Sequence, residues 1–161
     1  MDISERSLLP LGKVCAVITK QYLSVLGSKL NHLQINRYYY AFWVIAKNDG
    51  QITQKDLSTV LNADKVIIVR IVDYLSEKQF IQRKENPEDR RSHLLAITKT
   101  GEQYVKDVEK ALEQTDNELL HALPDDRKSD FISDLITVAN EAAEIQGERV
   151  ALDYSLINKD G

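Results

Sequence analysis

Residues that could support metal binding or nucleophilic catalysis are few and scattered in this sequence. The chain has one cysteine and three histidines: Cys15, His32, His93 and His121. Their spacings match no metal-ligand motif, and a single cysteine cannot form an internal disulfide. The sequence also lacks a nucleophile paired with a base. We therefore expect neither an enzyme nor a bound metal or cofactor.

The basic residues of segment 78–99 have a clearer chemical use. This segment contains six basic and three acidic residues, although the whole chain has a net charge of -4. It consists of two β-prone runs, FIQRK and HLLAI, separated by the polar stretch ENPEDRRS, whose composition favours a turn. The sequence predicts a β-hairpin with Arg90 and Arg91 at its tip, where guanidinium groups can enter the minor groove of DNA.

Charge is distributed unevenly along the chain. Residues 1–101 contain 15 Lys and Arg against 10 Asp and Glu, whereas residues 102–161 contain 6 against 15. Such asymmetry is typical of a part that faces a polyanion and is joined to an acidic scaffold. The alternative is that the acidic helices only keep the protein soluble.

An apolar stretch, KVIIVRIVDYL, occupies residues 65–75, just before the predicted hairpin. Seven of its eleven residues are Val, Ile or Leu, which a buried strand would allow, but they do not alternate with polar residues. Helical spacing instead gives one core stripe: Ile68, Ile71, Val72 and Leu75. Val66, Arg70 and Asp73 then point the other way, so we predict a helix with a basic residue on its outer face.

A shorter helix is predicted just before this one. Thr53 and Asp56 form a capping box in which Asp replaces the usual Glu. Asn62 tolerates a left-handed backbone and allows a tight turn, and Asp64 can cap the next helix. Two short helices joined by a tight turn and followed by a hairpin are the elements of a winged helix-turn-helix.

Further helices are predicted on both sides of these elements. Apolar residues recur at helical steps over 11–30, and segment 37–48 is apolar nearly all round. Cys15 lies on the first of these apolar stripes, which favours an inert thiol in a core or a dimer interface; the alternative is a reactive thiol. Beyond Thr98, and again beyond Pro124, apolar residues follow a near-heptad seam. We expect these seams to pack against a second copy of the chain, because a winged helix is too small to bury them. The alternative is a helical hairpin that folds back on its own core.

The sequence thus predicts a mainly α protein with a small β-hairpin wing: a winged helix-turn-helix plus a helical dimerisation region. We place an N-terminal dimerisation helix in 1–36, the winged helix-turn-helix in 37–101, and C-terminal dimerisation helices and a tail in 102–161. No apolar run approaches the length of about 20 residues that crosses a bilayer, and the N-terminus lacks the order of a signal peptide. We therefore expect a cytoplasmic protein without a membrane partner.

A resemblance to a known family rests on two segments, LSTVLNADKVIIVRIVDYLSEKQFIQRK and NPEDRRSHLLAITKTG. Together they resemble the multiple-antibiotic-resistance regulator (MarR) family of winged-helix transcription regulators, most strongly over residues 52–101. The wing pattern of that family is matched by six residues: Asp89, Arg91, Leu95, Ile97, Thr98 and Gly101. The resemblance implies a homodimer that binds a pseudo-palindromic operator in double-stranded DNA and acts as a repressor or an activator.

The resemblance also assigns roles to particular residues. It implies a positioning helix at 53–61, a recognition helix at 64–78 and a bond from Asp89 that braces Arg91. The implied DNA contacts are Lys65, Val66, Ile67, Val69, Arg70, Arg90 and Arg91. Gln79 stands where the family has glycine, which costs about 1 kcal/mol if the backbone there is left-handed.

Val66, Ile67 and Val69 depart from the family, which tends to carry small polar residues at these positions. Their side chains cannot hydrogen-bond to base edges, but they can pack on thymine methyl groups of an A·T-rich operator. The alternative function is a dimeric winged-helix protein-interaction module with weakened DNA readout.

Members of the resembled family often respond to a ligand that binds between the dimer helices and the winged helix. The aromatic residues that could line such a pocket here are Tyr38, Tyr39, Tyr40 and Trp43. They imply an inducer that is a small aromatic or lipophilic molecule. The alternative is that most of these aromatics belong to the core.

Overall fold

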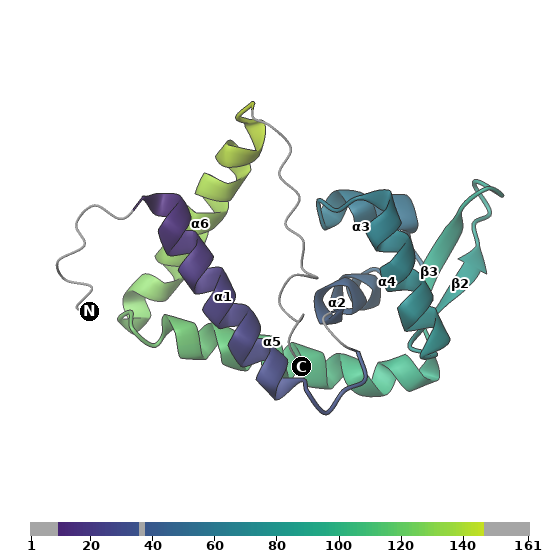
Figure 1. Cartoon of the computed structure of the whole chain (residues 1–161), viewed down its shortest axis with the longest axis horizontal. Helices are drawn as coiled ribbons and strands as arrows, with labels where there is room; N and C mark the ends of the chain where they lie inside the picture. Colours follow the sequence, from purple (N-terminus) through teal and green to yellow (C-terminus); the bar gives the residue numbers. More distant parts are fainter. Residues whose placement is uncertain (1–9, 36–37, 147–161) are drawn as a thin grey trace.

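The computed structural model describes residues 10–35 and 38–146, which form six α-helices and three short strands (Figure 1). The elements, in chain order, are α1 (Leu11–Lys29), α2 (Tyr39–Lys47), β1 (Ile52–Thr53), α3 (Gln54–Val60), α4 (Lys65–Glu77), β2 (Ile81–Glu85), β3 (His93–Ile97), α5 (Lys99–Leu120) and α6 (Asp125–Glu144). The predicted mainly α fold with a β-hairpin wing is confirmed. The tail GERVALDYSLINKDG lies outside the described residues.

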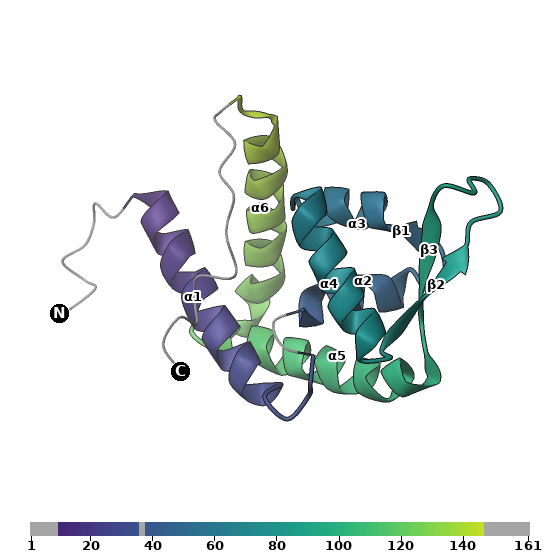
Figure 2. The same cartoon turned by 45° about the vertical axis from the view of Figure 1, so that its right-hand side comes forward.

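The winged helix-turn-helix is one packed unit formed by α2, α3, α4 and the sheet. The three strands are antiparallel in the order β1-β3-β2, with Ile81 opposite Ile97 and Glu85 opposite His93. Its core is built from fully buried apolar side chains: Phe42, Ile45, Leu57, Ile68, Val72, Leu75, Ile81 and Leu95. Figures 1 and 2 show this unit at one end of α5, with the β2–β3 hairpin projecting away from the helices.

Local sequence signals account for the helix-turn-helix. Thr53 and Asp56 form the predicted capping box at the start of α3, with the Thr53 backbone N–H 3.0 Å from the Asp56 carboxylate. Asn62 has a φ of 46°, which makes the tight turn before α4. Asp64 is the N-cap of α4, as predicted, although its side chain makes no capping hydrogen bond. The buried residues of α4 are the predicted core stripe.

The junction between the wing and α5 depends on close backbone contacts. Gln79 has a φ of 59°, so the left-handed conformation anticipated from the missing glycine is present. Thr98 caps α5 by accepting a hydrogen bond of 3.0 Å from the Gly101 backbone N–H. A Cβ atom at Gly101 would collide with the Phe80 carbonyl oxygen, so only glycine fits there. These contacts fix where the hairpin leaves the helical core.

Part of the α5 seam is buried within the chain. Val108, Ala111 and Thr115 are buried on α5, which packs against α1 and α2. Lys29 on α1 forms an ion pair of 2.7 Å with Glu118 on α5. Burial and a hydrogen bond to Asp116 on α5 raise the pKa of the Tyr22 phenol on α1. The expectation that the whole seam awaits a second copy is therefore wrong for this part of α5.

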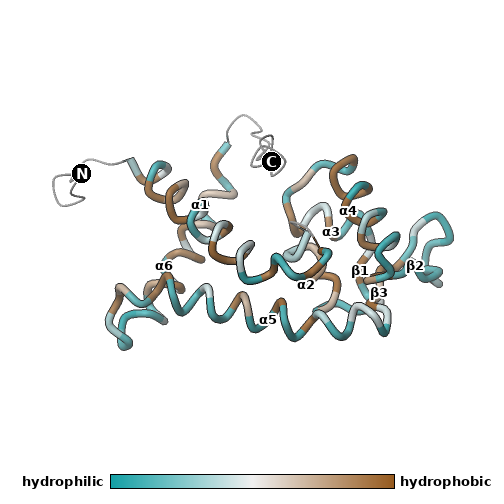
Figure 3. Tube along the Cα trace, turned by 60° about the horizontal axis from the view of Figure 1, so that its bottom comes forward, coloured by the Kyte–Doolittle hydropathy of each residue, from teal (hydrophilic) through white to brown (hydrophobic). Residues whose placement is uncertain are grey.

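α6 contains no buried residue. Phe131 of α6 is half-buried, and the other large apolar side chains of α6 are exposed, as are those of the first half of α1: Leu11, Val14, Val17 and Ile18 on α1, and Ile132, Leu135, Ile136 and Val138 on α6. Hydrophobic positions recur along both helices in Figure 3, away from the winged helix. Cys15, expected in a core or an interface, is also exposed in the single chain. The alternative in which α6 folds back on the chain's own core is thus not what the structure shows.

Candidate nucleic-acid interface

The predicted contact residues of α4 lie outside the core. Val66 is 63% exposed and Val69 is 37% exposed, whereas Ile68, between them, is buried. Lys65 and Arg70 are exposed and Ile67 is half-buried. The helix therefore presents an apolar face, formed by Val66, Ile67 and Val69, with a basic residue at each end.

The predicted wing arginines lie at the tip of the β2–β3 hairpin. Arg90 and Arg91 are both exposed. Side chains within the tip hold its shape: Asn86 donates to the Ser92 hydroxyl at 2.8 Å and accepts from the Glu88 backbone N–H at 3.0 Å. The two guanidinium groups are therefore presented on an ordered turn.

The bracing contact of Asp89 differs from the expected one. Its carboxylate accepts a hydrogen bond of 2.9 Å from the backbone N–H of Arg91, not from the guanidinium group. Asp side chains commonly bind the backbone two residues further on, because this contact closes a short local turn. Asp89 thus shapes the loop and leaves the Arg91 side chain able to reach a ligand.

The sequence did not indicate the ion pair that joins the wing to the recognition helix. The Arg83 guanidinium on β2 is 2.5 Å from the Asp73 carboxylate on α4. The two residues are ten positions apart and belong to different elements, so no helical or strand periodicity relates them. Only the packing of β2 against α4 could have revealed the pair.

The aromatic residues proposed as a ligand pocket are dispersed. Tyr39 is 6% exposed and belongs to the core, and the Tyr38 ring packs edge-on against Tyr74 at 5.1 Å. Tyr40 and Trp43 stack with ring centroids 5.8 Å apart. Trp43 lines a cavity of about 420 Å³ between α2 and α5.

The surroundings of Trp43 are charged. The Lys47 ammonium lies 5.8 Å from the Trp43 ring and forms an ion pair of 2.7 Å with Glu109 on α5. Glu113 and Asp116 also line this cavity. The Lys47 ammonium on α2 thus contacts both the Trp43 ring and the Glu109 carboxylate, and its ion pair with Glu109 joins the winged helix to α5.

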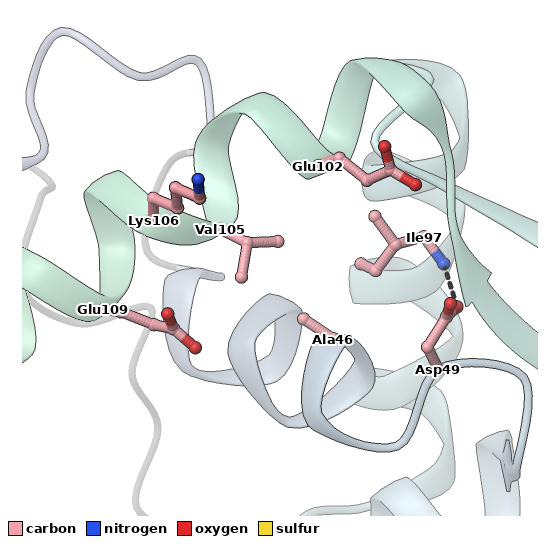
Figure 4. A pocket seen from close by; sticks show the side chains of 7 residues that line it. All are labelled: Ala46, Asp49, Ile97, Glu102, Val105, Lys106 and Glu109. Atoms are coloured by element: carbon pink, nitrogen blue, oxygen red, sulfur yellow. Dashed lines mark hydrogen bonds between the residues drawn. The ribbon is translucent and has the colours of Figure 1, made fainter.

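A second cavity of about 350 Å³ lies next to the first and shares Glu109 with it. Figure 4 shows its lining side chains, which come from α2, the turn after it, the end of β3 and the first half of α5. Within it, Asp49 accepts a hydrogen bond of 2.7 Å from the Ile97 backbone N–H. Ala46, Ile97 and Val105 contribute the apolar part of the lining.

Two negative findings concern only residues 10–35 and 38–146. No group of three or more His, Cys, Asp or Glu in these ranges could hold a metal ion. In the same ranges, none of the helices has the length and the apolar character needed to span a membrane.

A helix-turn-helix, a β-hairpin wing beside it and a long helix leading away define the class as a winged-helix protein with a DNA-binding fold. The model of the MarR family matches residues 43–93, from α2 to the first residue of β3. A crystal structure of MarR is similar with a TM-score of 0.75 and 28% identity, covering 89% of this chain and 95% of that one. Residues 43–93 thus resemble the MarR family, and the fold of the MarR crystal structure extends over 89% of the chain.

Other solved structures share the fold. A MarR transcriptional regulator from Methanosarcina mazei Go1 is 22% identical with a TM-score of 0.77, and 84% of this chain covers 98% of that one. A mutant MarR from E. coli, complexed with operator DNA, is 23% identical with a TM-score of 0.72; 83% of this chain covers 96% of that one. DNA binding and dimerisation are typical of the family.

Proposed function

We propose that the protein binds a pseudo-palindromic DNA operator as a homodimer, with α4 in the major groove and the wing in the minor groove. The observation that carries this proposal is the placement of Arg90 and Arg91, exposed on an ordered hairpin tip beside the exposed face of α4. Guanidinium groups on a projecting hairpin suit the negative potential of a narrow minor groove. The operator complex of the E. coli MarR mutant supports this use of the fold.

The exposed apolar sides of α1 and α6 support the homodimer. Val17 and Ile18 on α1 and Leu135, Ile136 and Val138 on α6 are each at least 40% exposed. Burying such side chains against a second copy removes apolar surface from water, at roughly 25 cal/mol per Å². A two-fold dimer also presents two recognition helices, which reach successive major grooves when they lie about 34 Å apart.

The apolar face of α4 determines what kind of sequence such a dimer prefers. Val66 and Val69 can contact thymine methyl groups but cannot discriminate bases by hydrogen bonds. We therefore expect half-sites rich in A·T pairs, with thymine opposite Val66. The same exposed valines favour the second candidate function, a protein-interaction module with weakened DNA readout.

Selection of bound duplexes from a random pool separates these two functions. The wild type should enrich thymine-rich half-sites, and Val66→Ser should lose that enrichment, because serine offers no comparable apolar contact. Val60→Ser is the matched control, since Val60 is 55% exposed on α3 and is not among the proposed contacts. Enrichment of no sequence by the wild type would favour the interaction module.

A salt titration tests the wing separately. The logarithm of the binding constant falls with the logarithm of salt concentration by about 0.9 for each phosphate neutralised. Arg90→Gln combined with Arg91→Gln should weaken binding to every duplex and make this slope less steep. An unchanged affinity would remove the wing from the interface.

We also propose that a small aromatic or lipophilic ligand modulates DNA binding from the cavity beside Trp43. A ligand that separates Trp43, Lys47 and Glu109 would alter how the winged helix sits on α5, and hence the spacing of the two recognition helices. Trp43 is the only tryptophan, so its fluorescence reports binding directly. Titration with benzoate and with benzylamine should change that fluorescence and release operator DNA. If both compounds leave the emission and the operator complex unchanged, ligand control from this cavity is contradicted.

A further inference from the structure

The ion pair between Arg83 and Asp73 links the two parts of the proposed DNA-binding surface. Arg83 lies on β2 of the wing, and Asp73 lies on α4. A second nitrogen of the same guanidinium group donates to the Ser76 hydroxyl at 3.4 Å. Asp73 and Ser76 are three residues apart and therefore lie next to each other on the surface of α4. The planar guanidinium group of Arg83 contacts both of them.

The position of Arg83 within β2 explains why it reaches the helix. Side chains alternate along a strand, so Arg83 shares a face with Ile81, which is buried in the core. Gln82 and Lys84 belong to the opposite face. Lys84 makes no ion pair within the described wing, and its ammonium lies 4.0 Å from where a Cβ of Gly50 would stand. Adjacent basic residues of one strand therefore have different surroundings.

The position of Asp73 within α4 makes the pair relevant to DNA. By helical spacing, Asp73 follows Val66 and Arg70 on the face that points away from the core stripe. An acidic group on a surface that approaches phosphates is electrostatically unfavourable. Asp73 is 60% exposed at its side chain, so burial does not hide its charge. The contact to Arg83 both compensates this charge and joins α4 to the wing.

We propose that Arg83 is a positioning residue: through Asp73 it holds the wing at a fixed angle to the recognition helix, so that both elements engage DNA together. This inference rests on the proposed DNA-binding function and adds a residue outside the expected contact set. An ordered wing loses less conformational entropy on binding than a wing that moves against the helix. The pair therefore contributes to affinity without contacting a base or a phosphate.

Asp73→Asn gives the decisive measurement, because two physical effects then have opposite signs. Electrostatics alone predicts tighter DNA binding, since the substitution removes a negative charge near the phosphates. Loss of positioning predicts weaker binding, by about tenfold for a dimer that carries two such pairs. The matched control is Glu77→Gln, which removes an exposed carboxylate from α4 that forms no ion pair within the described residues.

Arg83→Gln and the double variant complete the test. Arg83→Gln should weaken binding as much as Asp73→Asn, the double variant should bind as weakly as either single variant and no more weakly, and the salt slope should stay at its wild-type value. Lys84→Gln removes the same charge from the opposite face and is the control for charge alone. In the full-length protein without DNA, Asp73→Asn and Arg83→Gln should speed hydrogen exchange in the wing, and Lys84→Gln should not. A pair this exposed contributes little to stability, so all variants should fold.

Three outcomes would overturn the proposal. Tighter binding by Asp73→Asn, together with a flatter salt slope for Arg83→Gln, would make Arg83 a phosphate contact. Recovery of wild-type affinity by the double variant would reduce the pair to charge compensation. Unchanged hydrogen exchange in the wing would exclude a mechanical role. If the wild type binds no duplex at all, the proposed DNA-binding function fails, whereas the exchange measurement still tests the link between wing and helix.

Discussion

The winged helix-turn-helix and α6 differ in what they bury within one chain. The winged helix-turn-helix fully buries Phe42, Leu57 and Leu95. In α6, by contrast, Leu135 is 40% exposed and Val138 is 50% exposed. Both regions carry apolar residues at helical or strand spacing, so periodicity alone does not distinguish them. The difference teaches that a hydrophobic stripe predicts burial but not whether the partner lies in the same chain.

The largest expected effect tests the self-contained region. Leu57→Ala should lower the free energy of unfolding by about 3 kcal/mol, because it leaves a cavity beneath α3 in a site with no exposure. Urea denaturation measures this change. Val60→Ala, on the exposed end of the same helix, is the control and should stay within about 0.5 kcal/mol of the wild type. Equal effects of the two variants would contradict the core assigned to this region.

The next effect tests α6, which has no buried residue in the described part of the chain. Leu135→Glu should weaken dimer association by about 2 kcal/mol, because it places a charge on the apolar side of α6. Sedimentation equilibrium measures the dissociation constant, which should rise about thirtyfold. Ser133→Glu, at an exposed polar position of the same helix, should leave it unchanged. A monomeric wild type would contradict the proposed interface.

A smaller effect concerns the capping box of α3 and its dependence on pH. Thr53→Ala should lower the free energy of unfolding by about 1 kcal/mol at neutral pH. Hydrogen bonds from the side chain and backbone of Thr53 lower the pKa of the Asp56 carboxyl below its ordinary value of 3.8. The pKa of Asp56 is lower in the folded protein than in the unfolded chain. The stabilisation by this carboxylate is therefore present above pH 4 and is lost as the pH falls through the folded-state pKa.

Chemical denaturation between pH 7 and pH 2 checks the capping-box prediction. The difference between wild type and Thr53→Ala should shrink towards the acid end of this range. Thr59→Ala, near the other end of α3, should show a small difference at every pH. A difference for Thr53→Ala that grew on acidification would contradict the assigned direction of the Asp56 pKa shift.

The smallest effect is a gain in stability at the junction between α4 and the wing. Gln79→Gly should raise the free energy of unfolding by about 0.5 to 1 kcal/mol, because its φ of 59° suits glycine better than a side chain. Thermal denaturation measures the gain. Gln82→Gly, in the extended backbone of β2, should instead destabilise the protein. A loss of stability in Gln79→Gly would mean that the Gln79 side chain contributes more than the strain costs.

Much of the fold followed from local patterns along the chain. The capping box at Thr53, the left-handed turn at Asn62 and the core stripe of α4 were all predicted and are all present. The two-residue strand β1 was not predicted, because it is too short to show an alternation and exists through pairing with β3. The placement of the candidate contacts on α4 and the wing followed from the same patterns, but the contact partner of Asp89 did not.

The sequence by itself determined the order of the helices, the hairpin and the core stripe of α4, because backbone propensity and periodicity act over a few residues. Only the tertiary structure decided that Arg83 meets Asp73, that α5 buries Val108 against its own chain, and that α6 stays exposed. Such contacts depend on how distant elements pack, and spacing along one element carries no information about which surface it will meet.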